Sequence, residues 1–215
     1  MTILSILHQF QQLLINPHSD YALITINRAA QMNSLSLATM DELASAIQTL
    51  RADPSIRRIV VTGAGGIFSA GADLNEIRQI DPVSAFEFSR RGQAILNLFS
   101  RQSAQDALTI AAIDGHCLGG GLDLALACEV RLATSRSTFA HPGAKRGIIT
   151  GWGGTARLPR LIGRPEAFRM FLTGDRVDAH EALRIGLIDE LCENPVERAL
   201  TYSEKGSGAI RRESR

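Results

Sequence analysis

The sequence is poor in cysteine and has no long apolar run. Its three cysteines, Cys117, Cys128 and Cys192, are widely spaced and form no C-x-x-C pair. This spacing argues against a disulfide framework and against a structural zinc site, and it predicts reduced thiols in a cytoplasmic compartment. No apolar stretch approaches the ~20 residues that a membrane-spanning helix requires, so we expect no membrane segment.

An excess of charge of either sign is also missing. The 215 residues contain 23 Lys and Arg against 22 Asp and Glu, which gives a formal net charge of +1. Such a balance produces no strong field to attract nucleic acid or an anionic membrane surface, so we expect neither as a partner. No basic residue precedes Arg28, which argues against a signal or transit peptide.

What the sequence does contain is a regular alternation of strand and helix patterns. Residues 10–15 and 21–26 read as a hairpin around a cluster of turn formers, and further strands are predicted at 59–62, 110–113, 130–133 and 138–140. Helices are predicted at 36–51, 74–80, 82–101, 122–128, 156–161, 165–173 and 179–185. With 45% hydrophobic residues, this pattern predicts an α/β fold with one sizeable core.

A run of three glycines, residues 119–121, lies between the predicted strand at 110–113 and the predicted helix at 122–128. Consecutive glycines cost conformational entropy, so we expect them where the backbone takes unusual dihedral angles or approaches another group closely. At the start of a helix, free N–H groups and the helix dipole favour a bound negative charge. A tight turn packed on neighbouring backbone explains these glycines equally well.

A second stretch has the same design. The predicted strand at 59–62 is followed by the glycine-rich residues 63–66 and then by small residues that end at Asp73, where a helical pattern begins. Two such strand ends can each supply one backbone N–H to a shared point, as an oxyanion hole requires. A dinucleotide-binding loop is excluded because Phe68 occupies its last glycine position, and the chain has no Walker-type lysine and no G-x-S-x-G elbow.

Two motifs carry a family resemblance: residues 68–74, Phe-Ser-Ala-Gly-Ala-Asp-Leu, and residues 115–123, Gly-His-Cys-Leu-Gly-Gly-Gly-Leu-Asp. The chain resembles the crotonase superfamily, the enoyl-CoA hydratase/isomerase fold, in these motifs and in their order. The match runs from about residue 21 to residue 191, and it also includes residues 26–28, 33–35, 153–158 and 182–189.

The resemblance implies a crotonase-like β-β-α superhelix. It implies a core domain over residues 1–191 and a short, frayed tail over 192–215, so that the C-terminal helical region is short or truncated. It also implies an enzyme of fatty acid metabolism that processes acyl-CoA thioesters and forms a homo-oligomer, a trimer or a dimer of trimers. No cofactor and no metal are implied, because coenzyme A enters as part of the substrate.

The family's motifs also imply roles for individual positions. The N–H groups of Ala72 and Gly120 correspond to the two oxyanion-hole donors, which stabilise the charge that develops on a thioester oxygen. The segments expected to contact coenzyme A, chiefly through the backbone, contribute Ala70, Asp73, Leu74, Asn75 and Gly119.

Asp123 is the residue that we expect to transfer protons. It corresponds to the first of the two catalytic glutamates of the hydratases that the chain resembles. The structural alternative is that an acidic residue in the first turn of a helix is stabilised by the helix dipole alone, by ~0.3–1 kcal/mol.

The second glutamate of those hydratases corresponds to Gly143, which has no side chain. Hydration needs one proton removed from water and one delivered to the α-carbon, work that two carboxylates usually share. A bound anion, a water molecule, the substrate or His141 is expected to take the empty place, and His141 is a candidate because the ordinary pKa of histidine is near neutrality. Because a histidine beside a strand end is more often a structural hydrogen-bonding group, that is the role we expect for both His141 and His116.

Three activities follow as alternatives. The first is an enoyl-CoA hydratase or isomerase that uses Asp123 as its acid and base. The second is another crotonase chemistry, the hydrolysis or decarboxylation of an acyl-CoA, in which the oxyanion hole matters and the missing glutamate does not. The third is a catalytically weak subunit that binds CoA esters, which Gly143 favours.

Overall fold

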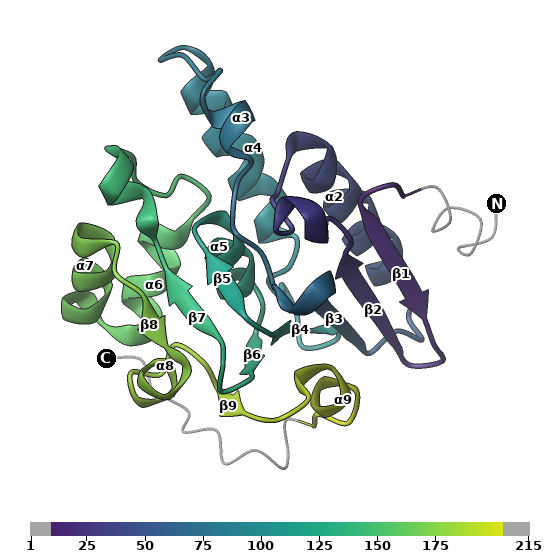
Figure 1. Ribbon diagram of the computed structural model, residues 1–215. Coiled ribbons are helices and arrows are strands. Elements are labelled where there is room, and N and C mark those ends of the chain that lie inside the picture. Colours follow the sequence, from purple (N-terminus) through teal and green to yellow (C-terminus); the bar gives the residue numbers. More distant parts are fainter. Residues whose placement is uncertain (1–9, 204–215) are drawn as a thin grey trace.

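The computed structural model describes residues 10–203, and their strands form two sheets (Figure 1). The larger sheet has the order β1-β2-β3-β4-β6-β9, and the smaller sheet has the order β5-β7-β8. Strand β1 pairs antiparallel with β2, and β8 pairs antiparallel with β7; the other pairs in the described residues are parallel. The α/β architecture agrees with the prediction.

The elements have the following bounds. The strands are Leu13–Pro17 (β1), Tyr21–Ile26 (β2), Arg58–Gly63 (β3), Leu108–Ile113 (β4), His116–Leu118 (β5), Val130–Ala133 (β6), Thr138–Ala140 (β7), Val177–Asp178 (β8) and Glu190–Leu191 (β9). The α-helices are Leu37–Arg51 (α2), Leu74–Ile77 (α3), Ser84–Asn97 (α4), Gly120–Ala127 (α5), Gly154–Ile162 (α6), Arg164–Thr173 (α7), Ala179–Arg184 (α8) and Pro195–Leu200 (α9). Short 3-10 turns cover Ala29–Gln31 (η1), Ala64–Gly66 (η2) and Pro142–Arg146 (η3).

Local sequence explains several of these boundaries. Helix α2 begins after Ser36, whose hydroxyl accepts a hydrogen bond from the Thr39 amide and so satisfies one of the free N–H groups of the first turn. Asp73 caps α3 in the same way through the Asn75 amide, and Asp178 caps α8 through the Glu181 amide. Strand β4 is buried along its whole length, in agreement with a sequence that is apolar except for Thr109, whose hydroxyl donates to Phe99 O at 2.7 Å.

Three predicted elements differ from the structure by three or more residues at one end. The helix predicted at 74–80 ends at Ile77. The first strand begins at Leu13 rather than at residue 10 and extends to Pro17. Proline is tolerated in β1 because this is an edge strand, whose outer N–H groups need no partner. Helix α4 spans residues 84–97 rather than 82–101: the Asp81 carboxylate accepts hydrogen bonds from the amides of Val83 and Ser84 and sets the helix start beyond Pro82. Strands β5, β8 and β9, with two or three residues each, were not predicted because so short a segment shows no periodicity.

Helix α9 packs against β3, β4 and β6, and Figure 1 shows it at the lower edge of the molecule, away from α4 and α5. Its residue Ala199 and the following Tyr202 are buried in a small apolar cluster with side chains of these strands, among them Val60 and Ile110. Residues 195–202 are therefore continuous with the core. The frayed tail was predicted over residues 192–215, and for the described part of it, up to residue 203, the prediction is wrong, because α9 and Tyr202 pack there. Residues 204–215 lie outside the described residues. No helix within residues 10–203 is long and apolar enough to cross a membrane.

The junction between the two sheets brings the two predicted glycine-rich stretches together. Beyond β4 the chain turns at Gly115, which has a φ of +67°, and enters β5 of the smaller sheet. A parallel bridge joins Ser69 to Cys117 in β5: the Ser69 amide donates to His116 O and the Leu118 amide donates to Ser69 O, each at 2.9 Å. The chain segment after β3 therefore lies beside the start of α5.

Candidate active site

The backbone segments 69–72 and 117–120 are in close contact. Gly71 has a φ of +99°, and a Cβ at this position would lie 2.7 Å from Leu118 O and 2.9 Å from the Gly120 nitrogen. A Cβ at Gly120 would in turn lie 3.1 Å from the Ala72 nitrogen. Glycine is required at Gly71 by both its dihedral angle and this contact, whereas at Gly120 the contact with Ala72 leaves a side chain little room. The structure therefore brings together the two stretches that the sequence singled out.

The amides of Ala72 and Gly120 are free of protein partners. Within residues 10–203 neither amide donates a hydrogen bond, although the neighbouring amides do: Asp73 N donates to Leu35 O at 3.2 Å and Gly119 N donates to Ala140 O at 2.8 Å. The Gly120 amide is one of the unsatisfied N–H groups at the start of α5, where the helix dipole adds positive potential. The arrangement suits a bound oxyanion.

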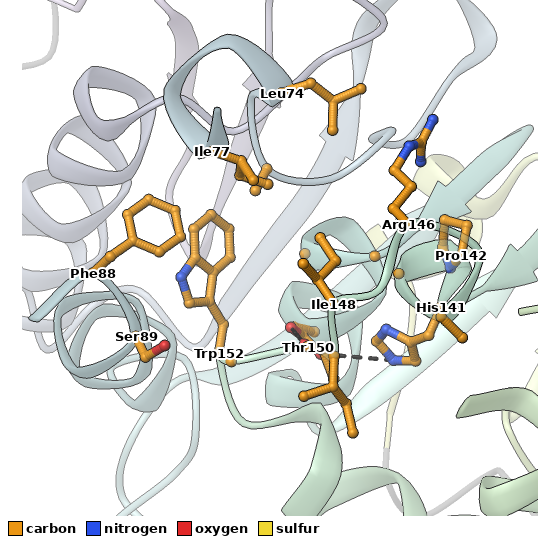
Figure 2. A pocket seen from close by; sticks show the side chains of 18 of the residues that line it. Leu74, Ile77, Phe88, Ser89, His141, Pro142, Arg146, Ile148, Thr150 and Trp152 are labelled. Carbon is orange, nitrogen blue, oxygen red and sulfur yellow. Dashed lines mark hydrogen bonds and ion pairs between the residues drawn. The ribbon is translucent and has the colours of Figure 1, made fainter. Parts of the chain in front are cut away.

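Both of these residues line a cavity of about 320 Å³. Figure 2 shows its wall from close by, with Phe88 and Trp152 side by side and with His141 and Thr150 together. Of the ten site residues predicted from sequence, eight line the cavity: Ala70, Ala72, Leu74, Gly119, Gly120, Asp123, His141 and Gly143. The other two, Asp73 and Asn75, do not line it. The Asp73 carboxylate instead caps α3 and accepts a hydrogen bond from Ser34.

Asp123 lies in the first turn of α5 with only 1% of its surface exposed. Its Oδ2 accepts a hydrogen bond from the Thr150 hydroxyl, whereas its Oδ1 has no hydrogen-bond partner among the described residues. Burial raises the pKa of this carboxyl to about 7, because the charged form loses its hydration; the Thr150 hydrogen bond and the positive charge of Arg157 oppose the shift. The carboxyl is therefore close to half protonated at neutral pH.

Helix α6 approaches Asp123 so closely that only glycine fits at its first position. A Cβ at Gly154 would lie 2.1 Å from Asp123 Oδ1 and 3.1 Å from the His141 ring. The loop before α6 supplies Thr150, and α6 supplies Arg157, whose guanidinium donates to Trp152 O at 3.1 Å. The predicted motif at residues 153–158 thus makes space for the carboxyl and places a positive charge near it.

His141 lies beside this carboxyl, at the end of β7. Its Nε2 is 3.7 Å from Asp123 Oδ1, a contact that the dashed line ending on His141 marks in Figure 2. Neither ring nitrogen has a hydrogen-bond partner among the described residues, and the ring is 3% exposed. Burial lowers the pKa of His141 to about 4, so the imidazole is neutral at pH 7.

The two histidines therefore differ from each other. His116 has the predicted structural role, since its Nδ1 hydrogen-bonds the Thr138 hydroxyl at 2.9 Å across the smaller sheet. For His141 the prediction of a structural hydrogen bond is wrong, because the ring packs on Phe171, with 5.1 Å between ring centroids, and hydrogen-bonds no described residue.

The sequence matches the family model described as enoyl-CoA hydratase/isomerase over residues 18–203. The chain belongs to the enoyl-CoA hydratase/isomerase family. The resemblance to the crotonase superfamily is thereby confirmed.

Individual relatives agree with this membership. The crotonyl-CoA hydratase of Syntrophomonas wolfei is 35% identical over 202 residues, which cover 94% of this chain and 76% of that protein. The putative enoyl-CoA hydratase/isomerase YngF of Bacillus subtilis is 40% identical over 200 residues, which cover 88% of this chain and 75% of YngF.

Solved structures confirm the crotonase fold. The putative enoyl-CoA hydratase from Rhodopseudomonas palustris matches 88% of this chain and 72% of its own with a TM-score of 0.81 at 34% identity. DspI from Pseudomonas aeruginosa matches 88% of this chain and 78% of its own with a TM-score of 0.80 at 38% identity.

The cavity is poor in carboxylates. Asp123 is the only acidic residue that lines it within the described part of the chain. Gly143 also lines the cavity, and a Cβ there would lie 2.6 Å from Ile148 O, so a side chain at this position requires the backbone of η3 and its following loop to move. In the observed backbone conformation, this contact leaves no room for a side chain at position 143.

Sequence reasoning missed two residues of the site, Thr150 and Trp152. Trp152 is 3% exposed and packs against Phe88 in a tilted arrangement, with 5.3 Å between ring centroids and 36° between the ring planes. Its ring occupies the space beside two glycines: a Cβ at Gly92 would lie 2.1 Å from the indole, and a Cβ at Gly120 would lie 2.6 Å from it. Two features of the sequence could have indicated Trp152: it is the single tryptophan and lies between glycines, and a glycine interrupts the helical pattern of α4.

No group of His, Cys, Asp and Glu side chains within residues 10–203 is arranged to hold a metal ion.

Proposed function

We propose that this protein binds enoyl-CoA thioesters and adds water across their α,β double bond, with Asp123 as acid and base. One observation carries the proposal: two amides without partners, from Ala72 and Gly120, and one carboxyl with a pKa of about 7 face the same cavity. The names of the relatives in the family support it.

The two amides act on the thioester carbonyl. Attack at the β-carbon moves the electrons of the double bond toward the carbonyl, and the oxygen gains negative charge as the enolate forms. Fixed backbone dipoles stabilise this charge without reorganising, and one such donor is typically worth ~3 kcal/mol of the barrier. Ala72 and Gly120 are thus proposed as the oxyanion hole.

Asp123 moves the protons. Its carboxylate takes a proton from water as the water oxygen forms a bond to the β-carbon, and the enolate electrons accumulate on the thioester oxygen. The Asp123 carboxyl then returns a proton to the α-carbon, the carbonyl re-forms and the carboxylate is regenerated. A pKa close to the working pH suits a group that must both accept and donate.

The rest of the cavity suits an acyl chain attached to coenzyme A. Its lining is mainly apolar and includes Leu74, Ile77, Phe88 and Ile148 (Figure 2). Coenzyme A is part of the substrate in this proposal, and no further cofactor is needed. The contacts to coenzyme A that involve Asp73 and Asn75 stay predictions, since neither residue lines the cavity.

A homo-oligomer, a trimer or a dimer of trimers, stays a prediction as well. The exposed apolar residues Phe168 and Leu172 on α7 support it, because an isolated subunit leaves them in water. Light scattering coupled to size-exclusion chromatography tests this prediction, and a monomer at micromolar concentration would contradict it.

The lack of a second carboxylate favours isomerisation as a second candidate activity. Moving the double bond of an enoyl-CoA takes one proton from one carbon and returns it to another, which a single carboxyl can do. The Asp123 carboxyl, as the only acidic group of the described lining, has the environment for this work.

Steady-state assays of the purified protein test the proposal. We expect hydration of crotonyl-CoA by the wild type and a loss of 10²–10⁴-fold in Asp123→Asn, the usual contribution of a proton-transferring group. Asp175→Asn is the control, because Asp175 is exposed and pairs only with surface residues.

The same panel includes but-3-enoyl-CoA, whose conversion to crotonyl-CoA reports isomerisation, and saturated acyl-CoAs, whose release of free CoA reports hydrolysis. Hydration that persists in Asp123→Asn would overturn the role of Asp123. A wild type that binds crotonyl-CoA but converts none of these substrates would overturn the proposed function and favour a subunit that only binds CoA esters.

A further inference from the structure

Three buried polar atoms without hydrogen bonds lie close together at the wall of the cavity. They are Asp123 Oδ1 and the two ring nitrogens of His141. Both side chains line the cavity and are at least 97% buried. Because a buried polar atom without a partner has lost its hydration and gained nothing in return, native structures rarely leave such atoms together unless a water molecule or a ligand hydrogen-bonds to them.

The geometry of this cluster suits one small oxygen ligand. His141 Nε2 and Asp123 Oδ1 are 3.7 Å apart, too far for a hydrogen bond to each other. An oxygen placed about 2.9 Å from each atom, the ordinary hydrogen-bond length, completes a triangle with that side. The other oxygen of Asp123 is already held by Thr150, so the free oxygen is the one that faces His141.

We infer that His141 Nε2 and Asp123 Oδ1 together hold the water molecule that adds to the enoyl thioester, so that His141 takes over the work of the carboxylate missing at Gly143. The inference rests on the proposed hydratase function and names a second residue that touches a reacting group. One hydrogen bond from the water goes to His141, and the water proton that is lost goes to Asp123 as the oxygen bonds to the β-carbon.

The protonation state of His141 agrees with this role. Its low pKa, a result of burial, keeps the imidazole neutral across the physiological range. A neutral imidazole has one donor and one acceptor, so it orients water without competing for the proton that Asp123 must take. A cationic histidine at this place would instead hold the carboxylate as an ion pair and weaken it as a base.

One further buried polar atom of the described lining has no hydrogen-bond partner, Trp152 Nε1, but it belongs to the ring that packs against Phe88. The polar side chains next to Asp123 are already engaged. Thr150 already donates to Asp123 Oδ2. Arg157 approaches Asp123 from α6, but its two terminal nitrogens donate to Trp152 O and to the Asn97 side chain. The contact between His141 and Asp123 is the only ionisable pair in which both members line the cavity within residues 10–203.

Three variants at His141 test the role atom by atom. His141→Leu keeps much of the volume and removes both nitrogens; His141→Gln returns a polar amide near the position of Nε2; His141→Asn returns one near Nδ1. His180→Gln, on the exposed start of α8, is the matched control. Crotonyl-CoA hydration is measured as kcat and KM over a pH series, and thermal unfolding confirms that each variant is folded.

We expect His141→Leu to lower kcat about 100-fold with KM within threefold, because the water loses its orientation while the thioester still binds. His141→Gln recovers most of that loss, His141→Asn does not, and His180→Gln matches the wild type. The midpoint of the pH–rate profile stays within about half a unit in all His141 variants, because Asp123 keeps its own surroundings. If His141→Leu does not fold, the contrast between Gln and Asn carries the test.

Three results would overturn the inference. One is a His141→Leu variant within threefold of the wild type, and another is equal activity of the Gln and Asn variants. The third is a shifted pH midpoint in step with the loss of kcat, because it would show that His141 acts by positioning Asp123. An active wild type with any of these results leaves the proposed function standing, whereas a wild type that hydrates no enoyl-CoA overturns both.

Discussion

Two buried ionisable residues on neighbouring elements, Arg131 in β6 and Asp123 in α5, differ in how completely they are hydrogen-bonded. Arg131 is 5% exposed, and all three of its guanidinium nitrogens donate: Nε to Leu187 O at 2.9 Å, Nη1 to Cys128 O at 2.7 Å and Nη2 to Asp189 at 2.8 Å. Asp123 is 1% exposed, and one of its two oxygens has no partner among the described residues.

This difference in hydrogen bonding indicates a structural role for Arg131 and a binding role for Asp123. A buried charge whose hydrogen-bonding groups are all paired holds parts of the fold together, and Arg131 ties the end of α5 to the turn before β9. A buried carboxyl with an unpaired oxygen lies beside a histidine with two unpaired nitrogens, which is the arrangement of a site that binds a ligand or a water molecule. Leaving these groups unpaired lowers the stability of the folded protein, and favourable interactions elsewhere in the fold compensate for this loss.

The largest effect is expected when the charge of Asp123 is removed. Besides losing activity, Asp123→Asn should gain stability above pH 7, by a few kcal/mol, because folding then no longer buries a carboxylate; a shift of the pKa from 3.8 to about 7 corresponds to roughly 1.4 kcal/mol for each unit. Urea unfolding at pH 8 measures the gain. A variant that is both inactive and less stable than the wild type would contradict the account.

Removing the charge of Arg131 should have the opposite effects: a loss of stability with little change in activity. Arg131→Met leaves the carbonyls of Cys128 and Leu187 without their donor and removes one of the two hydrogen bonds from Arg131 to the Asp189 carboxylate. The expected cost is about 2–3 kcal/mol, which is low for a buried pair because Asp189 is 39% exposed and keeps the bond from the Arg131 amide. Activity at 20 °C should stay within threefold. The control is Arg184→Met, an exposed ion pair whose loss should leave the urea midpoint unchanged.

The pH dependence of stability separates the two members of the site. The pKa of Asp123 is raised in the folded protein, so its contribution to stability is present at low pH and is lost as pH rises from 3.8 toward 7. The pKa of His141 is lowered, so its contribution is present above pH 6.5 and is lost as pH falls toward 4. The two slopes oppose each other between pH 4 and 7 in the wild type.

Single variants should uncover these slopes. Asp123→Asn should become more stable as pH rises from 4 to 6.5, whereas His141→Gln should become less stable over the same range. Urea unfolding at four pH values measures both relative to the wild type. Equal slopes in the two variants would show that burial does not shift the pKa values of the pair in opposite directions.

The smallest effect is expected at Thr150. Its hydroxyl hydrogen bond lowers the pKa of Asp123, so Thr150→Val should raise that pKa further and move the midpoint of the pH–rate profile to higher pH. Activity at pH 7 falls as the carboxylate form becomes rarer and returns at alkaline pH. Thr201→Val, on the exposed end of α9, serves as control; an unmoved midpoint in Thr150→Val would contradict the assignment of the profile to Asp123.

Local signals allowed much of the fold to be predicted from sequence. The bounds of β2, β6 and β7 agree with the prediction, and the helices predicted to begin at residues 74 and 179 do begin there, capped by Asp73 and Asp178. Hydrophobic periodicity and capping chemistry act over a few residues, so a single sequence displays them. The site residues came instead from the resemblance to the family's motifs, and eight of the ten line one cavity.

What escaped prediction depends on contacts between distant residues. Thr150 meets Asp123 across 27 positions of sequence, and Trp152 needs the space left by Gly92 in another helix. No local pattern marks either pairing. His141 was expected to be hydrogen-bonded because strand ends usually supply partners, and only the three-dimensional packing shows that its ring faces a cavity instead.

The vibrational frequency of a bound thioester tests the central claim most directly. Crotonyl-CoA labelled with ¹³C at the carbonyl, bound to the inactive Asp123→Asn variant, gives an isotope-edited infrared band that reports the hydrogen bonds on that one oxygen. If the amides of Ala72 and Gly120 converge on it, the band lies at lower wavenumber in the complex than in water. A band at or above its frequency in water would contradict the account.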